Sequence, residues 1–269
     1  MGGQGKMSIF KPITKELEAV NAMLQKEYII KAGHLNSYAH LETTSLNSII
    51  RPATVILSGR LFNYISNQVI ALAAVVQFIY MASSIHFRIN EDQKEDKGPK
   101  DGSQFPVLVG DYLYGKFFTS LCNAELAKYL GPLSQVICSI HEGGILRRKA
   151  SNPYSNENSN ENKIISLQQE ITYKETGTLF ETGCRISSEL AGTSTEDQLN
   201  VQEFARELGT AYGLIENRVD VNNIVLHLEK AGISLKKLPQ NKYHQILRNL
   251  LDQLQKDMPS IVKQNAIGS

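Results

Sequence analysis

The sequence predicts an all-α protein, because three of its features favour helices. Apolar residues recur at helical spacing through most of the 269 residues, prolines and glycines fall where helices begin and end, and no segment alternates with period two for long. Hydrophobic residues make up 42% of the chain and charged residues 20%, which suffices for a large core and excludes wholesale disorder. We therefore expect a single domain over residues 1–269.

The expected helices follow one another from the N-terminus. The first is amphipathic and ends at Gly33, and the second begins at Pro52, a residue that the first turn of a helix tolerates. Two polar stretches rich in Asn, Ser, Gly and Pro, at 90–104 and 151–162, are expected to be mobile loops. The helical segments expected from the pattern are 15–32, 52–89, 105–148, 164–190, 201–230 and 242–256.

Charge and composition exclude several classes of protein. Lys and Arg number 28 and Asp and Glu number 27, so nothing in the balance predicts nucleic-acid binding. Cys122, Cys138 and Cys184 are too scattered for a disulfide scaffold or a zinc site. The apolar stretch 69–87 is nearly long enough to cross a bilayer, but polar residues interrupt it, and it is expected to be the central helix of a soluble bundle. We expect a cytoplasmic protein, with peripheral membrane contact as the remaining option.

Four short segments occur in a fixed order and together carry a resemblance. The chain is similar to the trans-polyprenyl diphosphate synthases, which make farnesyl, geranylgeranyl and longer prenyl diphosphates, over residues 47–220. The resemblance implies an isoprenoid-synthase-type helical bundle around a central cavity, usually dimeric. The segments are Arg51-Pro52, FPVLVGDYL at 105–113, TGTLF at 176–180 and LGTAYGLIENRVD at 208–220.

Members of this family ionise an allylic diphosphate and join the resulting cation to isopentenyl diphosphate. The resemblance implies two Asp-Asp-x-x-Asp motifs on facing helices, which hold the Mg²⁺ ions that neutralise the leaving diphosphate. The first and fifth residues of such a motif share one face of a helix, so their carboxylates converge on the metal cluster.

The first motif corresponds to residues 87–91 and has lost both of its leading aspartates. Phe87 and Arg88 stand in their places, and only Glu91 could hold a metal. The cation of Arg88 opposes Mg²⁺ binding directly.

The second motif corresponds to residues 216–220 and is partly kept. Glu216 and Asp220 retain carboxylates four residues apart, whereas Asn217 has lost its charge and Gly213 replaces the glutamine of the family. Glu91, Glu216 and Asp220 are therefore weak metal candidates.

The cations that bind diphosphate in the family are also reduced. Arg51 is what remains of the family's Gly-Lys-Arg-x-Arg-Pro segment, and Tyr80 stands where the next helix carries a histidine. Lys174 is displaced by one residue from the family's Lys-Thr motif, so that Glu175 takes the place of the lysine. Arg51 and Lys174 are the two expected diphosphate-binding residues.

The resemblance also assigns the residues that limit product length. In the family, bulky side chains one turn before the first motif close the floor of the cavity, and here Ala82 and Ser83 are small. We expect an open channel at that level, with Tyr80 or Phe87 narrowing its mouth. The alternative is that other side chains fill the space. Asp111 is expected to be a packing or capping group, and the basic run 147–149 a solvated helix end.

These losses at both metal motifs predict a non-catalytic subunit of a heteromeric polyprenyl diphosphate synthase that helps to set product length. It would pair, as a heterodimer or heterotetramer, with a subunit that carries intact motifs and binds Mg²⁺, and no cofactor is expected for this chain alone. A homodimer is the other option. A weak or unusual prenyltransferase using Glu91, Glu216 and Asp220, and a protein that binds a prenyl chain in the remaining cavity, are the alternative functions.

Overall fold

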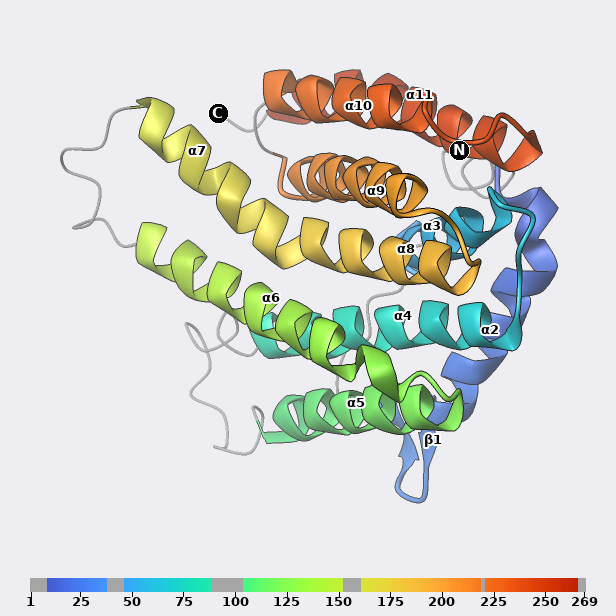
Figure 1. Ribbon diagram of the computed structural model, residues 1–269. Coiled ribbons are helices and arrows are strands. Elements are labelled where there is room, and N and C mark those ends of the chain that lie inside the picture. Colours follow the sequence, from blue (N-terminus) through green and yellow to red (C-terminus); the bar gives the residue numbers. More distant parts are fainter. Residues whose placement is uncertain (1–8, 38–45, 89–103, 152–160, 219–220, 266–269) are drawn as a thin grey trace. The chain divides into compact units, whose positions relative to one another are not determined.

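The computed structural model describes residues 9–37, 46–88, 104–151, 161–218 and 221–265 (Figure 1). The chain divides into two compact units, Met1–Ile56 with Ile65–Gly131 (unit 1) and Leu57–Tyr64 with Pro132–Ser269 (unit 2). Helices make up nearly all of the described residues, which confirms the predicted all-α class. The expectation of a single domain stays a prediction.

Unit 1 is built around one apolar helix. Helix α4 (Asn67–Arg88) is buried without interruption from residue 71 to residue 79 and packs against α2 (Thr14–Tyr28) and α5 (Gln104–Asn123). The hydroxyl of Tyr28 donates to the sulfur of Met81 at 3.0 Å and joins the end of α2 to α4. Unit 1 also contains the first half of α3 (Ile50–Arg60), whose second half belongs to unit 2.

The apolar character of α4 has a simple explanation in its burial. The helix is the one candidate membrane span among the described residues by length and composition, but 83% of its apolar window lies inside the fold. This burial favours the core helix predicted from the sequence.

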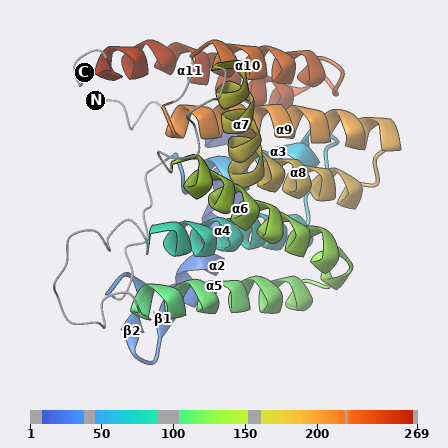
Figure 2. The ribbon, with the colours of Figure 1, turned by 90° about the vertical axis from the view of Figure 1, so that its left-hand side faces the viewer.

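Unit 2 contains the C-terminal helices. Helix α9 lies between α8 and α10 in both views (Figures 1 and 2). Its start is capped by Ser194, whose hydroxyl oxygen accepts a hydrogen bond from the amide of Asp197 at 3.1 Å. The helices of this unit are α6 (Leu130–Ala150), α7 (Glu161–Thr172), α8 (Thr178–Leu190), α9 (Thr195–Glu216), α10 (Val221–Leu235) and α11 (Lys242–Asn265), with a π-helical segment (Tyr173–Gly177) joining α7 to α8.

Three predicted helical segments are each divided in two in the structure. The second ends with α3 at Arg60 and resumes at Asn67, the third ends with α5 at Asn123, and the segment 201–230 is interrupted after Glu216. Near each break one non-glycine residue adopts a left-handed conformation, namely Asn63 at φ 56°, Glu125 at 59° and Arg218 at 54°. Sequence rules expect glycine there, as at Gly192 with φ 70°, and therefore missed these ends.

The termination at Glu125 has the hydrogen bonds of a Schellman motif. The amide of Leu126 donates to the carbonyl of Leu121 at 2.9 Å, and the amide of Glu125 donates to the carbonyl of Cys122 at 3.0 Å. The backbone thus forms the hydrogen bonds of a glycine-type cap, although the left-handed conformation is sterically unfavourable for Glu125.

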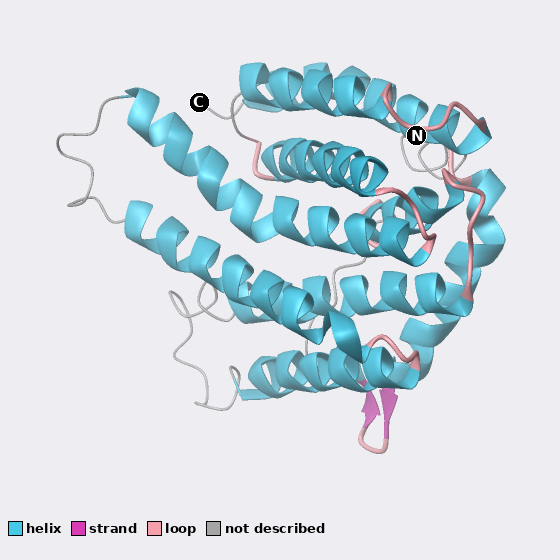
Figure 3. Ribbon diagram, in the orientation of Figure 1, coloured by secondary structure: helices cyan, strands magenta, loops and turns pink. Residues whose placement is uncertain are grey.

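The prediction that the first helix extends to residue 32 is wrong. The expectation that the chain contains no sheet is also wrong. Helix α2 ends at Tyr28 and is followed by a small antiparallel hairpin of β1 (Ile29–Ile30) and β2 (Gly33–His34) (Figure 3). Gly33 has φ 124°, a conformation that other residues rarely adopt, and it pairs with Ile30 as the first residue of β2 directly after the turn at residues 31–32.

The two predicted loops lie mostly outside the described residues. At their described edges the helices begin earlier than expected, with Gln104 as the first residue of α5 and Glu161 as the first residue of α7.

Replacing Glu125 by glycine is expected to raise the free energy of unfolding by about 0.5–1 kcal/mol. The left-handed conformation costs a non-glycine residue roughly 1–2 kcal/mol, from which the greater chain entropy of glycine subtracts about half. The reverse change, Gly192→Ala, is expected to lower it by about 1 kcal/mol through backbone strain alone, because no atom lies within 4 Å of the added Cβ. Urea unfolding of both variants measures the change in the free energy of unfolding. A change of the same sign in both variants would contradict the left-handed conformation of Glu125.

Candidate functional site

The first motif falls at the end of α4 in unit 1. Phe87 is partly exposed in the last helical turn, Arg88 is the final residue of the helix, and Glu91 lies outside the described residues. The described part of this motif therefore contains no carboxylate.

Arg51 and Tyr80, both assigned to diphosphate binding or its neighbourhood, contact each other. The guanidinium carbon of Arg51 lies 3.5 Å from the centroid of the Tyr80 ring, and the Arg51 side chain is one of the largest fully enclosed in the protein. Its Nη1 donates to the carbonyl of Asn47 at 3.3 Å. The residue is only 2% exposed, and its guanidinium contacts an aromatic face and a backbone carbonyl.

The two small residues expected to open a channel are both buried. Ala82 is fully enclosed, and the hydroxyl of Ser83 lies 2.8 Å from the hydroxyl of Tyr114 and donates to the carbonyl of Ile79. Burial raises the pKa of Tyr114, while the hydrogen bond to Ser83 acts in the opposite direction. The phenol of Tyr114, from α5, thus occupies the space beside Ser83.

The glycine of the GDYL segment has a packing role in unit 1. A Cβ on Gly110 would lie 2.2 Å from Nε2 of His86, so the imidazole rests directly on the backbone of α5. The same nitrogen lies 3.4 Å from a carboxylate oxygen of Asp111. Asp111 therefore faces His86 on α4.

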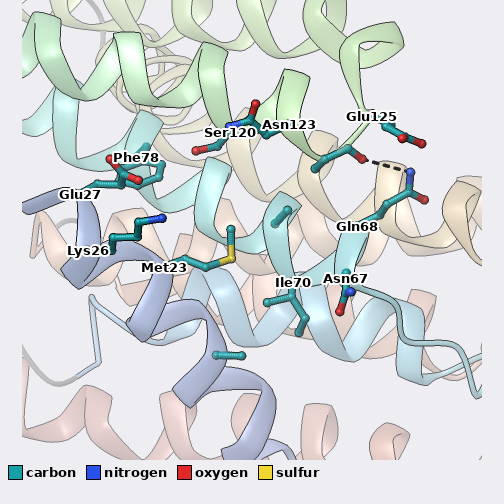
Figure 4. A pocket seen from close by; sticks show the side chains of 13 residues that line it. Met23, Lys26, Glu27, Asn67, Gln68, Ile70, Phe78, Ser120, Asn123 and Glu125 are labelled. Carbon is teal, nitrogen blue, oxygen red and sulfur yellow. Dashed lines mark hydrogen bonds between the residues drawn. The ribbon is translucent and has the colours of Figure 1, made fainter.

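A pocket of about 710 Å³ lies among α2, α4 and α5, and Figure 4 shows its lining. Met23, Ile70 and Phe78 give it apolar walls, and the amide of Gln68 donates to the carbonyl of Ala124 at 3.2 Å at one end. Tyr80, Ala82 and Ser83 are not among its lining residues. This hollow is thus separate from the positions assigned to chain length.

The second motif lies at the end of α9 in unit 2. Glu216 and Asn217 are exposed, and Asp220 lies outside the described residues. Asn217 lines a pocket of about 250 Å³ together with Arg147 and Lys163. The named neighbours of this motif in the pocket are thus cationic.

The π-helical segment carries the residues that align with the Lys-Thr motif. Nζ of Lys174 lies 3.0 Å from a carboxylate oxygen of Glu142 on α6. Nε of Arg147 donates to Glu175 at 2.9 Å, and its Nη2 also contacts that carboxylate. Both charges of the segment are therefore held in ion pairs with α6.

A partly buried polar cluster around Glu181 in unit 2 escaped the sequence analysis. Glu181 accepts hydrogen bonds from the hydroxyl of Tyr173 at 2.8 Å and from Gln202 at 2.6 Å, and Arg206 lies over the Tyr173 ring. Burial raises the pKa of Tyr173, and the hydrogen bond to Glu181 raises it further. The periodicity of one sequence cannot reveal this cluster, because two of its members come from another helix.

Close backbone packing leaves little room for a side chain at Gly213, where the resemblance implies a glutamine. A Cβ at Gly213 would lie 2.7 Å from Cγ2 of Thr172 and 2.8 Å from Oγ1 of Thr176. A Cβ at Gly209 would lie 2.8 Å from the Cβ of Phe180. The space that a longer side chain needs on α9 is taken by threonines of the facing helix.

Few side chains that could bind a metal lie among the described residues of the two motifs. Glu216 is their one described carboxylate, and among the described residues no three His, Cys, Asp or Glu side chains gather where they could hold a metal. Mg²⁺ prefers several oxygen ligands in octahedral geometry.

Restoring the family glutamine by Gly213→Gln is expected to lower the free energy of unfolding by about 1–3 kcal/mol through overpacking. Gly232→Ala on α10 is the matched control, because its Cβ would meet nothing within 4 Å. A mid-helix alanine is expected to leave stability unchanged or raise it by up to about 1 kcal/mol. Denaturant unfolding compares the two, and a neutral Gly213→Gln would show that α9 is not closely packed at this point.

Comparison with known proteins shows that part of this chain matches a protein family. Residues 97–236, just over half of the 269-residue chain, match the profile of the family described as polyprenyl synthetase. The octaprenyl diphosphate synthase of Escherichia coli (strain K12) is 26% identical over 213 residues, which cover 77% of this chain and 64% of that protein. The aligned region thus spans slightly under two thirds of this relative.

Solved structures agree in fold. The decaprenyl diphosphate synthase of Rhodobacter capsulatus superposes with a TM-score of 0.77 at 16% identity, covering 93% of this chain and 98% of that one. A mint heterotetrameric geranyl pyrophosphate synthase gives a TM-score of 0.66 at 17% identity, covering 88% and 97%. With the isoprenoid-synthase fold and the profile match together, the chain belongs to the polyprenyl synthetase family.

Proposed function

We propose that this chain is a non-catalytic subunit of a polyprenyl diphosphate synthase, which stabilises a catalytic partner and influences its product length. The observation that carries the proposal is the contact between Arg51 and Tyr80. A cation that binds diphosphate must be reachable by the substrate, and this one is 2% exposed with an aromatic ring on its face. The cation serves the packing of unit 1.

The charges of unit 2 support the same proposal. Lys174 and Arg147 are paired with Glu142 and Glu175, so the diphosphate would have to displace carboxylates. Each lost charge-assisted contact to a transition-state diphosphate costs on the order of 2–4 kcal/mol, or roughly one and a half to three decades of rate. In this proposal Mg²⁺ is bound by the partner.

An exposed face of α5 supports association with another chain. Leu108, Asp111, Gly115, Phe118 and Cys122 follow the three- and four-residue spacing of a helix–helix seam, and all five are exposed. No atom lies within 4 Å of a Cβ added at Gly115, so a second helix can approach the backbone there. The proposed occupant is a helix of a catalytic polyprenyl synthase subunit, and the heterotetrameric mint enzyme is a precedent for such assembly in this fold.

An active prenyltransferase is the second candidate, because the matched relatives are named as synthases. It would act on isopentenyl diphosphate and an allylic diphosphate with Glu91, Glu216 and Asp220 as metal ligands. Turnover by the purified chain distinguishes it from the first proposal.

The purified chain is expected to produce no prenyl diphosphate from radiolabelled isopentenyl diphosphate, an allylic primer and Mg²⁺. Mixed with candidate catalytic subunits, it is expected to raise activity or lengthen the product relative to the catalytic subunit alone. Phe118→Glu should abolish this effect by placing a charge on the α5 face, whereas Leu199→Glu, at an exposed position of α9, should not. Robust elongation by the chain alone would overturn the proposal in favour of the enzyme.

Restoring the aspartates by Phe87→Asp with Arg88→Asp is expected to leave the isolated chain inactive. The two added carboxylates do not expose Arg51, which remains buried against the Tyr80 ring. Calorimetry with inorganic diphosphate and Mg²⁺ should accordingly detect no tight binding in either protein. Mg²⁺-dependent binding at micromolar concentration, or turnover by the double variant, would contradict the view that the isopentenyl site is closed.

A further inference from the structure

We propose that two copies of this chain associate through one face of helix α10, with the two α10 helices antiparallel about a two-fold axis. This α10 face is defined by Glu229, Gly232, Ile233 and Lys236. The inference goes beyond the proposed function, concerns unit 2 alone and holds whether or not the chain has a catalytic partner. Together with such a partner on the α5 face, the contact would join two copies of each chain into a heterotetramer.

The α10 face borders a groove between α10 and α11, which lie side by side in both views (Figures 1 and 2). The groove has a volume of about 410 Å³, and the buried side chains of Leu228, Leu235 and Leu251 are among its lining residues. Nε2 of His244, on α11, donates to the carbonyl of Leu235 at 3.0 Å and ties the two helices together. The groove is therefore already formed in the single chain.

The four residues of the α10 face follow i, i+3, i+4, i+7 spacing, and all of them line the groove. Helical hydrogen bonding reaches the last of them, because the amide of Lys236 donates to the carbonyl of Gly232 at 3.2 Å. The side chain of Ile233 is 56% exposed, and a Cβ added at Gly232 would meet nothing within 4 Å. A protruding aliphatic side chain thus lies next to accessible backbone, which allows a second helix to pack closely.

The charges of the α10 face are placed symmetrically about its centre. Glu229 precedes Gly232 by three residues, and Lys236 follows Ile233 by three. In an antiparallel pair centred between Gly232 and Ile233, Glu229 of each copy therefore faces Lys236 of the other, and Ile233 of each faces the backbone of Gly232.

This symmetry favours a second copy of the chain over an unrelated helix. Glu229 and Lys236 are both exposed, and no ion pair joins either of them to another described side chain. A parallel pair would place like charges opposite each other, which is unfavourable, whereas the antiparallel pair forms two opposite-charge contacts. The α10 face is thus complementary to itself in charge and in shape.

Exchange of the two charges tests the contact on the full-length chain. Sedimentation equilibrium is expected to show reversible self-association of the unaltered chain at micromolar concentrations. Glu229→Lys or Lys236→Glu alone should raise the dissociation constant about 10- to 30-fold, because two attractive pairs become two repulsive ones. An equimolar mixture of the two single variants should associate as the unaltered chain does, since each lysine then faces a glutamate. The double variant should do the same on its own.

Matched variants separate the α10 face from charge in general and from the α5 face. Glu18→Lys and Lys15→Glu make the same charge changes at exposed positions of α2 and should leave self-association unchanged. Phe118→Glu should also leave it unchanged, which distinguishes this contact from the one proposed for a catalytic partner. Ile233→Glu, at an exposed position, should abolish it and provides a second reading. A chain that stays monomeric throughout this range, a mixture of single variants that fails to associate, or loss of association in Phe118→Glu but not in the α10 variants would each overturn the proposal.

Discussion

Unit 2 depends on how closely the backbone of α9 approaches the helix that runs from α7 through the π-helical segment into α8. At Gly177, Gly209 and Gly213 a single added carbon would come within 3 Å of a side-chain atom of the facing helix. This approach buries nearly the whole C-terminal half of α9, including the carboxylate of Glu207. That carboxylate contacts Nδ1 of His227 at 2.6 Å, and α10 is thereby fixed to the same helix. Gly213 is therefore part of the packing between the helices of unit 2.

The sequence predicted the class and the helical segments, since those depend on apolar periodicity that one chain displays in full. It missed where several helices end, because Asn63, Glu125 and Arg218 adopt a conformation that their side chains do not favour. For the candidate site, the sequence alone showed that Phe87 and Arg88 carry no carboxylate. The enclosure of Arg51 by Tyr80 was not, because that contact joins α3 to α4 and depends on how the two helices pack.

The charged and polar groups of the candidate site contribute to the stability of the fold. In an active site of this chemistry, cations and carboxylates must stay hydrated and available for diphosphate and metal. Here Arg147, Lys174 and Glu175 satisfy one another or a neighbouring helix, and Tyr114 fills the space beside Ser83. Each such pairing removes a cost of keeping polar groups unpartnered. These side chains thus contribute to cohesion within each unit.

The π-helical segment at Tyr173–Gly177 sets the orientation of the helix that follows it. An added residue in a regular α-helix turns every later side chain by about 100° around the axis. A π turn instead confines the extra residue to one loop of backbone, so that Leu179, Phe180 and Cys184 keep their inward orientation. Lys174 and Glu175 both lie in this segment. Deleting one residue within the segment should therefore regenerate an uninterrupted α-helix without turning the side chains beyond it.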